Sequence, residues 1–102
     1  MSRLETMEAF VQRFPLDPFP RYALALEYRS AGRLDDAVRT LRELRERLPA
    51  YVPSYLQLGM LLNDSGRTDE AREVLHAGLL RSREAKDAHA ASEIEALLES
   101  LE

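Results

Sequence analysis

The sequence of 102 residues contains no cysteine, which excludes disulfides and thiolate metal sites and is typical of a reducing compartment. Only eight residues are β-branched, against 18 leucines and 13 alanines, so little is available to build a β-sheet. No run approaches the roughly 18 consecutive apolar residues of a membrane span. Arg3, Glu5 and Glu8 interrupt the first ten residues, unlike a signal peptide. We therefore expect one all-α domain with a cytoplasmic location.

Prolines and glycines, although few, divide the chain into segments whose apolar residues recur every three or four positions. Proline lacks the backbone N–H that a helix interior needs, and glycine accepts the left-handed conformation that ends many helices. This pattern predicts six helices joined by short turns. They span about residues 4–14, 19–31, 35–48, 54–64, 69–83 and 87–101.

The turn that contains Gly32 recurs at an offset of 34 residues. Gly32, Arg33, Asp35 and Ala37 are answered by Gly66, Arg67, Asp69 and Ala71. Across residues 18–51 and 52–85 seven positions are identical, among them Leu24 with Leu58 and Leu41 with Leu75. A helix-turn-helix period of 34 residues is the signature of a stacked helical solenoid.

These residues resemble the tetratricopeptide repeat, with its aromatic and small residues on the first helix, glycine at the turn, and alanine on the second helix. The matching positions are Leu24, Ala25, Tyr28, Gly32, Ala37, Leu41 and Pro49 in the first repeat, and Tyr55, Leu58, Gly59, Leu62, Gly66, Ala71 and Leu75 in the second. Arg21 stands where the first repeat should have an aromatic residue, which suggests an exposed edge. Arg83 replaces the final proline of the second repeat and suggests a longer fifth helix.

The resemblance implies a short right-handed solenoid of antiparallel helix pairs in a single domain. Residues 1–17 form a half-repeat that caps the amino-terminal end, residues 18–51 and 52–85 are complete repeats, and residues 86–102 form a capping helix. Residues 1–83 carry 13 basic and 12 acidic side chains, whereas residues 84–102 carry one basic and six acidic ones. The net charge of −4 thus comes from the last segment, as expected of a solvated cap.

No constellation of residues indicates catalysis, a cofactor or a metal. His76 and His89 are 13 positions apart and lack a metal-ligand motif, and the four glycines are isolated rather than grouped in a phosphate loop. The acidic pairs at 35–36 and 69–70 fall at helix starts, where capping and the helix dipole favour negative charge. We expect a non-enzymatic protein.

The resemblance implies a concave groove, lined by the first helices of the repeats, that binds a protein partner. The corresponding residues are Phe19, Tyr22, Leu26, Arg29, Leu56, Gln57, Met60, Asn63 and Ile94. The last helix either adds Ile94 to this groove or packs over part of the set as core. The leading hypothesis is an interaction module for a hydrophobic or amphipathic peptide. One alternative is a homo-oligomeric scaffold formed through this groove or the last helix. A third is nucleic-acid binding through the arginine-rich helix at 35–48, although its arginines and glutamates are spaced to pair with each other.

Overall fold

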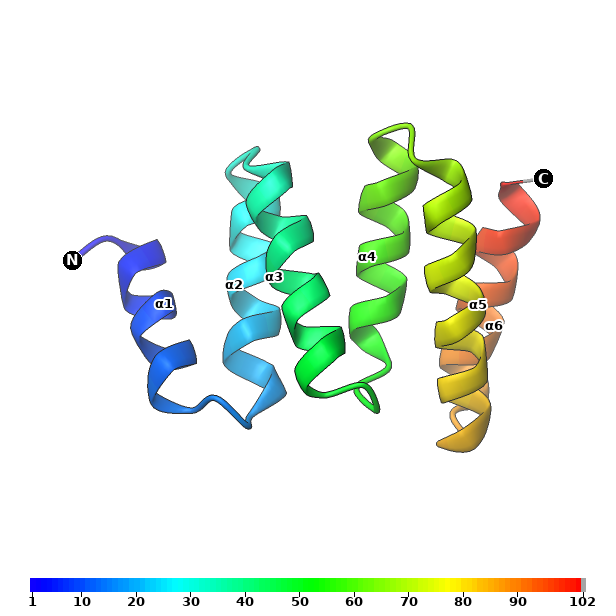
Figure 1. The fold of residues 1–102 in the computed structure, drawn as a ribbon, viewed down its shortest axis with the longest axis horizontal. Helices are drawn as coiled ribbons and strands as arrows, with labels where there is room; N and C mark the ends of the chain where they lie inside the picture. Colours follow the sequence, from blue (N-terminus) through cyan, green and yellow to red (C-terminus); the bar gives the residue numbers. More distant parts are fainter. Residues whose placement is uncertain (102) are drawn as a thin grey trace. The chain divides into compact units, whose positions relative to one another are not determined.

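A computed structural model describes residues 1–101 and contains six α-helices in this range (Figure 1). They are α1 (Arg3–Arg13), α2 (Pro18–Ser30), α3 (Leu34–Arg47), α4 (Pro53–Asp64), α5 (Thr68–Glu84) and α6 (Ala88–Ser100). The chain divides into two compact units, Met1–Leu48 with α1 to α3 and Pro49–Glu102 with α4 to α6. The all-α expectation is confirmed, and the expected helix bounds hold to within about one residue.

Polar caps and prolines begin the amino-terminal helices. Ser2 and Glu5 form a capping box, in which each side chain accepts a hydrogen bond from the backbone N–H of the other, at 3.1 and 3.2 Å. At α2, Asp17 Oδ1 accepts the N–H of Phe19 at 3.0 Å, and Pro18 follows directly. Proline is tolerated there because the first helical N–H groups have no intrahelical partner.

Three helices end in the same hydrogen-bonded turn, at Gly32, Gly66 and Lys86. In each, this residue has positive φ (76°, 80° and 57°) and donates its N–H to the carbonyl three residues earlier. The following residue donates to the carbonyl five residues earlier, at 2.9, 2.8 and 2.8 Å respectively. This is the Schellman motif, in which a left-handed residue satisfies the last carbonyls of a helix. The recurring glycine of the sequence is therefore required by backbone conformation in the first two turns.

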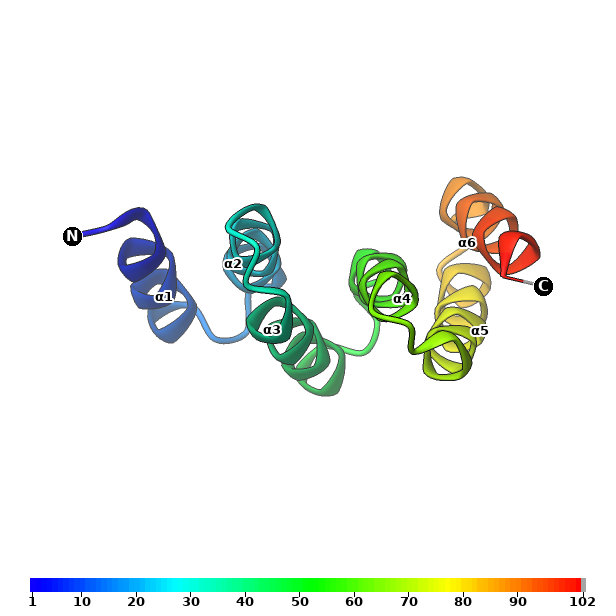
Figure 2. The same cartoon turned by 90° about the horizontal axis from the view of Figure 1, so that it is seen from above.

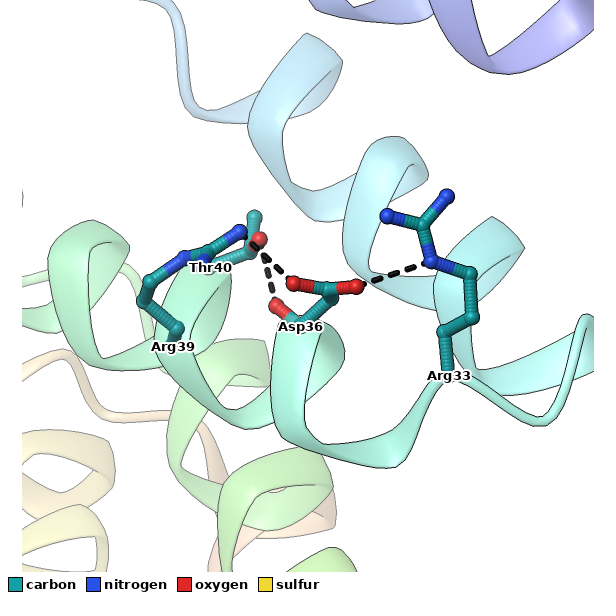
Figure 3. A network of polar contacts seen from close by, with 4 residues as sticks. All are labelled: Arg33, Asp36, Arg39 and Thr40. Atoms are coloured by element: carbon teal, nitrogen blue, oxygen red, sulfur yellow. Dashed lines mark hydrogen bonds and ion pairs between the residues drawn. The ribbon is translucent and has the colours of Figure 1, made fainter.

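The acidic pairs at the starts of α3 and α5 do not cap these helices with their side chains, which corrects the capping expectation. The N-cap residues are Arg33 and Arg67, and neither makes a side-chain cap. Asp36 instead forms ion pairs of 2.8 Å with both Arg33 and Arg39, and Thr40 donates to its backbone carbonyl at 2.7 Å (Figure 3). The carboxylates still lie in the first turn, where they complement the helix dipole.

In the first unit, α2 packs against both α1 and α3. The side chains that α2 and α3 bury include most of the first repeat's signature. The buried signature residues are Leu24, Ala25 and Tyr28 on α2, and Ala37 and Leu41 on α3. Helix α1, by contrast, buries none of its residues.

In the second unit, α5 packs against both α4 and α6, as the view in Figure 2 shows. Two glycines permit close helix contact. An added Cβ at Gly59 of α4 would lie 2.5 Å from Leu75 Cδ2, and one at Gly78 of α5 would lie 2.5 Å from Tyr55 Cβ. The buried signature residues of this unit are Tyr55, Leu58, Gly59, Leu62, Ala71 and Leu75. Helix α5 continues to Glu84, as expected from the missing proline at position 83.

Arg21 was expected to lie at an exposed edge, and this expectation is wrong: the residue is only 6% exposed. Its Nη1 donates to the carbonyl of Pro15 at 3.4 Å, while its Nε is buried and has no partner among the described residues. Burial lowers the pKa of the Arg21 guanidinium, and the nearby charge of Arg47 acts in the same direction. One repeat later, Tyr55 makes the corresponding contact, donating from its hydroxyl to the carbonyl of Pro49 at 2.6 Å.

We expect Arg21→Tyr to raise the free energy of unfolding by about 1 to 2 kcal/mol. The substitution removes a buried charge and an unpaired Nε, and its hydroxyl is placed to repeat the bond that Tyr55 makes. Urea denaturation measures the effect, with Arg21→Phe as the matched control that has the ring without the hydroxyl. A variant less stable than the wild type would show that the guanidinium is stabilising at this position.

Candidate protein-binding surfaces

One face of α2 carries the groove residues expected for the first repeat. Phe19, Tyr22, Leu26 and Arg29 follow at intervals of three and four and therefore share one side of the helix. Phe19 is 68% exposed, and the other three are half-buried. The first unit thus presents an apolar stripe with a single cation toward its carboxyl-terminal end.

Helix α4 carries the corresponding stripe in the second unit, where Leu56, Gln57, Met60 and Asn63 are all half-buried. Leu56 packs in part against the core. Asn63 Oδ1 accepts a hydrogen bond of 3.4 Å from Thr68 Oγ1 and so supports the turn into α5. Met60 is the second apolar residue of this stripe, after Leu56, and it is half-buried.

Ile94 does not line an accessible surface, which corrects its place among the expected groove residues. It is fully buried and forms a core cluster with Val52, Leu75 and Leu98. The apolar side of α6 packs onto this cluster because isoleucine, leucine and alanine follow at helical spacing. In the second unit α6 is part of the hydrophobic core.

A hollow of about 380 Å³ lies between α1 and α2 in the first unit. Apolar side chains line it except at Asp17. The lining residues are Met7, Phe10 and Phe14 from α1, Asp17 from the connecting turn, and Phe19, Pro20 and Ala23 from α2. The rings of Phe10 and Phe14 are stacked, with centroids 6.5 Å apart and planes inclined by 21°. Arg13 lies over the ring of Phe14, with its guanidinium carbon 5.4 Å from the ring centroid.

The sequence alone did not reveal this pocket. Met7, Phe10 and Phe14 lie on the apolar face of a capping helix, a pattern that does not distinguish full from partial burial. In the structure, Phe10 is 46% and Phe14 is 45% exposed. The only available signal was the presence of all three phenylalanines of the chain between positions 10 and 19.

Other chemistry finds little support in the described part of the chain. Residues 1–101 contain no group of three or more histidines and carboxylates that could hold a metal ion. None of the helices in this range is both long and apolar enough to span a membrane. In α3, Arg39 is paired with Asp36, and Arg42 and Arg45 also have interactions within the chain. These arginines are thus engaged internally, which does not favour a nucleic-acid surface.

Comparison with protein families connects the repeated turn and its buried signature to known proteins. The family model described as tetratricopeptide repeat matches residues 28–94. The chain belongs to the tetratricopeptide repeat family. Repeats of this family are generally protein–protein interaction modules, and they are typically non-catalytic. No curated protein matches the sequence.

Solved structures support the same conclusion. This tetratricopeptide repeat domain is 34% identical to a tetratricopeptide repeat domain protein from Salinibacter ruber, whose crystal structure superposes with a TM-score of 0.80. The alignment covers 83% of this chain and 94% of the Salinibacter chain. A solution structure of such a domain from the same organism is 35% identical over 84% and 87% of the two chains, with a TM-score of 0.82. A protein from Bordetella parapertussis, 24% identical over 99% and 88%, shares the fold with a TM-score of 0.81.

Proposed function

We propose that this tetratricopeptide repeat domain is a non-catalytic module that binds a hydrophobic or amphipathic peptide segment of a protein partner. The observation that carries the proposal is the apolar stripe of α2, where Phe19 is exposed and Tyr22 and Leu26 are partly accessible. A helix face that serves only as a solvated surface would carry polar residues at these positions. Helix α4 offers a matching stripe in its own unit through Leu56 and Met60.

Short peptides recognise such faces by burying two or three apolar anchors, and a few residues supply most of the binding energy. Tyr22 is the strongest candidate on α2, because it combines an aromatic ring with a polar hydroxyl and is half-buried before any partner binds.

The experiment starts from random 12-residue peptides displayed on phage and selected on the immobilised domain. Enriched peptides are synthesised, and their affinities are measured by isothermal titration calorimetry. We expect peptides with two or more apolar residues. We expect Tyr22→Ala to weaken those that bind the α2 stripe about 10-fold, and Met60→Ala to do the same for those that bind the α4 stripe, the usual effect of losing a central apolar contact.

Leu80→Ala is the matched control, because Leu80 is 61% exposed on α5 and lies outside both stripes. Circular dichroism checks that each variant remains folded. The proposal fails if no peptide is enriched, or if the enriched peptides bind the Tyr22→Ala and Met60→Ala variants as tightly as the wild type.

A further inference from the structure

The pocket between α1 and α2 is an incompletely filled apolar site. Three of its walls are phenylalanine rings that remain 46%, 45% and 68% exposed, at Phe10, Phe14 and Phe19 respectively. Helix α1 buries none of its residues, so its apolar side is only partly covered by α2. Exposed aromatic side chains that gather around a hollow, rather than lying scattered, are a mark of an interaction site.

The size of the pocket suits an aromatic side chain. A closed apolar cavity of about 150 Å³ accommodates a benzene molecule, and this open hollow of about 380 Å³ has room for one ring together with the backbone that carries it. Aromatic rings pack favourably at centroid distances of about 4.5 to 7 Å, and Phe10 and Phe14 already stand at 6.5 Å. A further ring can therefore continue an existing aromatic arrangement.

The exposed area favours a peptide over a second copy of the chain. At about 200 Å² for each phenylalanine, the accessible parts of the three rings add up to roughly 300 Å². Leu16 in the turn between α1 and α2 is 81% exposed, but it does not line the pocket. A stable protein dimer buries about 800 Å² on each partner. The patch is too small for that but sufficient for a single anchor.

Charges at the pocket are few and of both signs. Asp17 is the one ionised lining residue, and its Oδ1 is already engaged by the N–H of Phe19 at 3.0 Å. Arg13, which is not a lining residue, lies over the ring of Phe14. The pocket thus presents no strong field of either sign, and an uncharged anchor suits it better than a charged one.

We propose that the α1–α2 pocket receives one aromatic side chain of the bound peptide, phenylalanine or tryptophan, as a specificity anchor. This inference rests on the proposed peptide-binding function and adds the chemistry of the partner to it. Phe19 connects the two surfaces, because it lines the pocket and also begins the stripe of Tyr22 and Leu26.

The first test uses small probes that need no identified partner. The 15N-labelled domain is titrated with N-acetyl-tryptophanamide and N-acetyl-phenylalaninamide, with N-acetyl-alaninamide as the control compound. We expect saturable shifts at the lining residues with both aromatic probes, at about millimolar dissociation constants, and none with the alanine compound. Ala23→Met fills the pocket and Phe19→Ala removes a wall, so each variant should abolish the shifts, whereas Leu80→Ala should leave them unchanged.

The second test separates this inference from the proposed function by using the peptides selected on phage. We expect an aromatic residue in them, and a loss of affinity of at least about 10-fold with Phe19→Ala and with Ala23→Met. If Tyr22→Ala weakens these peptides while both pocket variants bind them normally, the aromatic anchor is overturned and peptide binding stands. If the aromatic probes saturate the pocket but no peptide is enriched, the proposed function fails and a peptide side chain is overturned as the occupant, while the preference of the pocket for aromatic groups stands. A change in the signals of Phe10, Phe14 and Phe19 on dilution would show that a second copy occupies the pocket and would overturn the inference.

Discussion

We expect Gly78→Val to lower the free energy of unfolding by roughly 3 kcal/mol, because α5 passes too close to α4 and α6 for any side chain at this position. A Cβ added at Gly78 would lie 2.5 Å from Tyr55 Cβ, 3.0 Å from its Cγ and 3.3 Å from Ile94 Cδ1. Tyr55 cannot turn away from this contact, since its Cβ is attached directly to the α4 backbone. Tyr55 is also 2% exposed and held at its far end by the bond to Pro49.

Urea denaturation followed by circular dichroism measures this loss. Gly78→Ala should show a smaller loss, because alanine adds one methyl group and gains about 1 kcal/mol of helix propensity over glycine. His76→Val, at an exposed position of the same helix, measures the general cost of a β-branched residue and should stay within about 0.5 kcal/mol of the wild type. A Gly78→Val protein as stable as the wild type would mean that α4 and α5 can separate without cost.

We expect Leu75→Ala to lower the free energy of unfolding by about 2 to 5 kcal/mol and to reverse the sign of the stability effect of Gly59→Ala. Leu75 is fully buried in the core of the second unit and occupies the space that Gly59 leaves open. In the wild type, Gly59→Ala brings a methyl group to 2.5 Å from Leu75 Cδ2 and 2.6 Å from its Cγ, so it should destabilise the protein. In the Leu75→Ala background this clash is gone, and the helix propensity of alanine should make Gly59→Ala stabilising by about 1 kcal/mol.

The four proteins form a double-mutant cycle, from which the coupling of the two positions is read directly. Leu41→Ala is the matched control, because Leu41 is the residue of the first repeat that corresponds to Leu75. The first repeat has Ala25, not glycine, at the position that corresponds to Gly59. Additive effects of Gly59→Ala and Leu75→Ala would contradict the close fit of these two residues.

Local chemistry made the family, the helices and the turns predictable from the sequence. Gly32 and Gly66 stand at positions with positive φ, and prolines precede or begin α2 and α4, so these residues report directly on the backbone. Lys86 shows the limit of this reasoning. It takes the same left-handed conformation at φ 57° without being glycine, and only the structure shows that its turn matches the other two.

Burial was harder to predict, because it depends on neighbours that are distant in the sequence. Arg21 looked like a surface residue by its charge, yet the packing of α2 buries it beside the carbonyl of Pro15. Ile94 looked accessible by its repeat position, yet α6 places it in the core. Phe10 and Phe14 show the opposite error. Their apolar rings suggest core residues, but they stay about half exposed because α1 packs against α2 on one side only.

The absence of buried residues in α1 has a thermodynamic consequence for binding. A helix attached only through half-covered side chains opens at a lower free energy than the core of its unit, so the pocket and α1 are lost together in such an opening. Any molecule that occupies the pocket binds only the closed form and therefore stabilises α1 by mass action. The affinity of the pocket for a ligand and the stability of α1 against local opening therefore depend on each other, because ligand binding and helix opening are coupled equilibria.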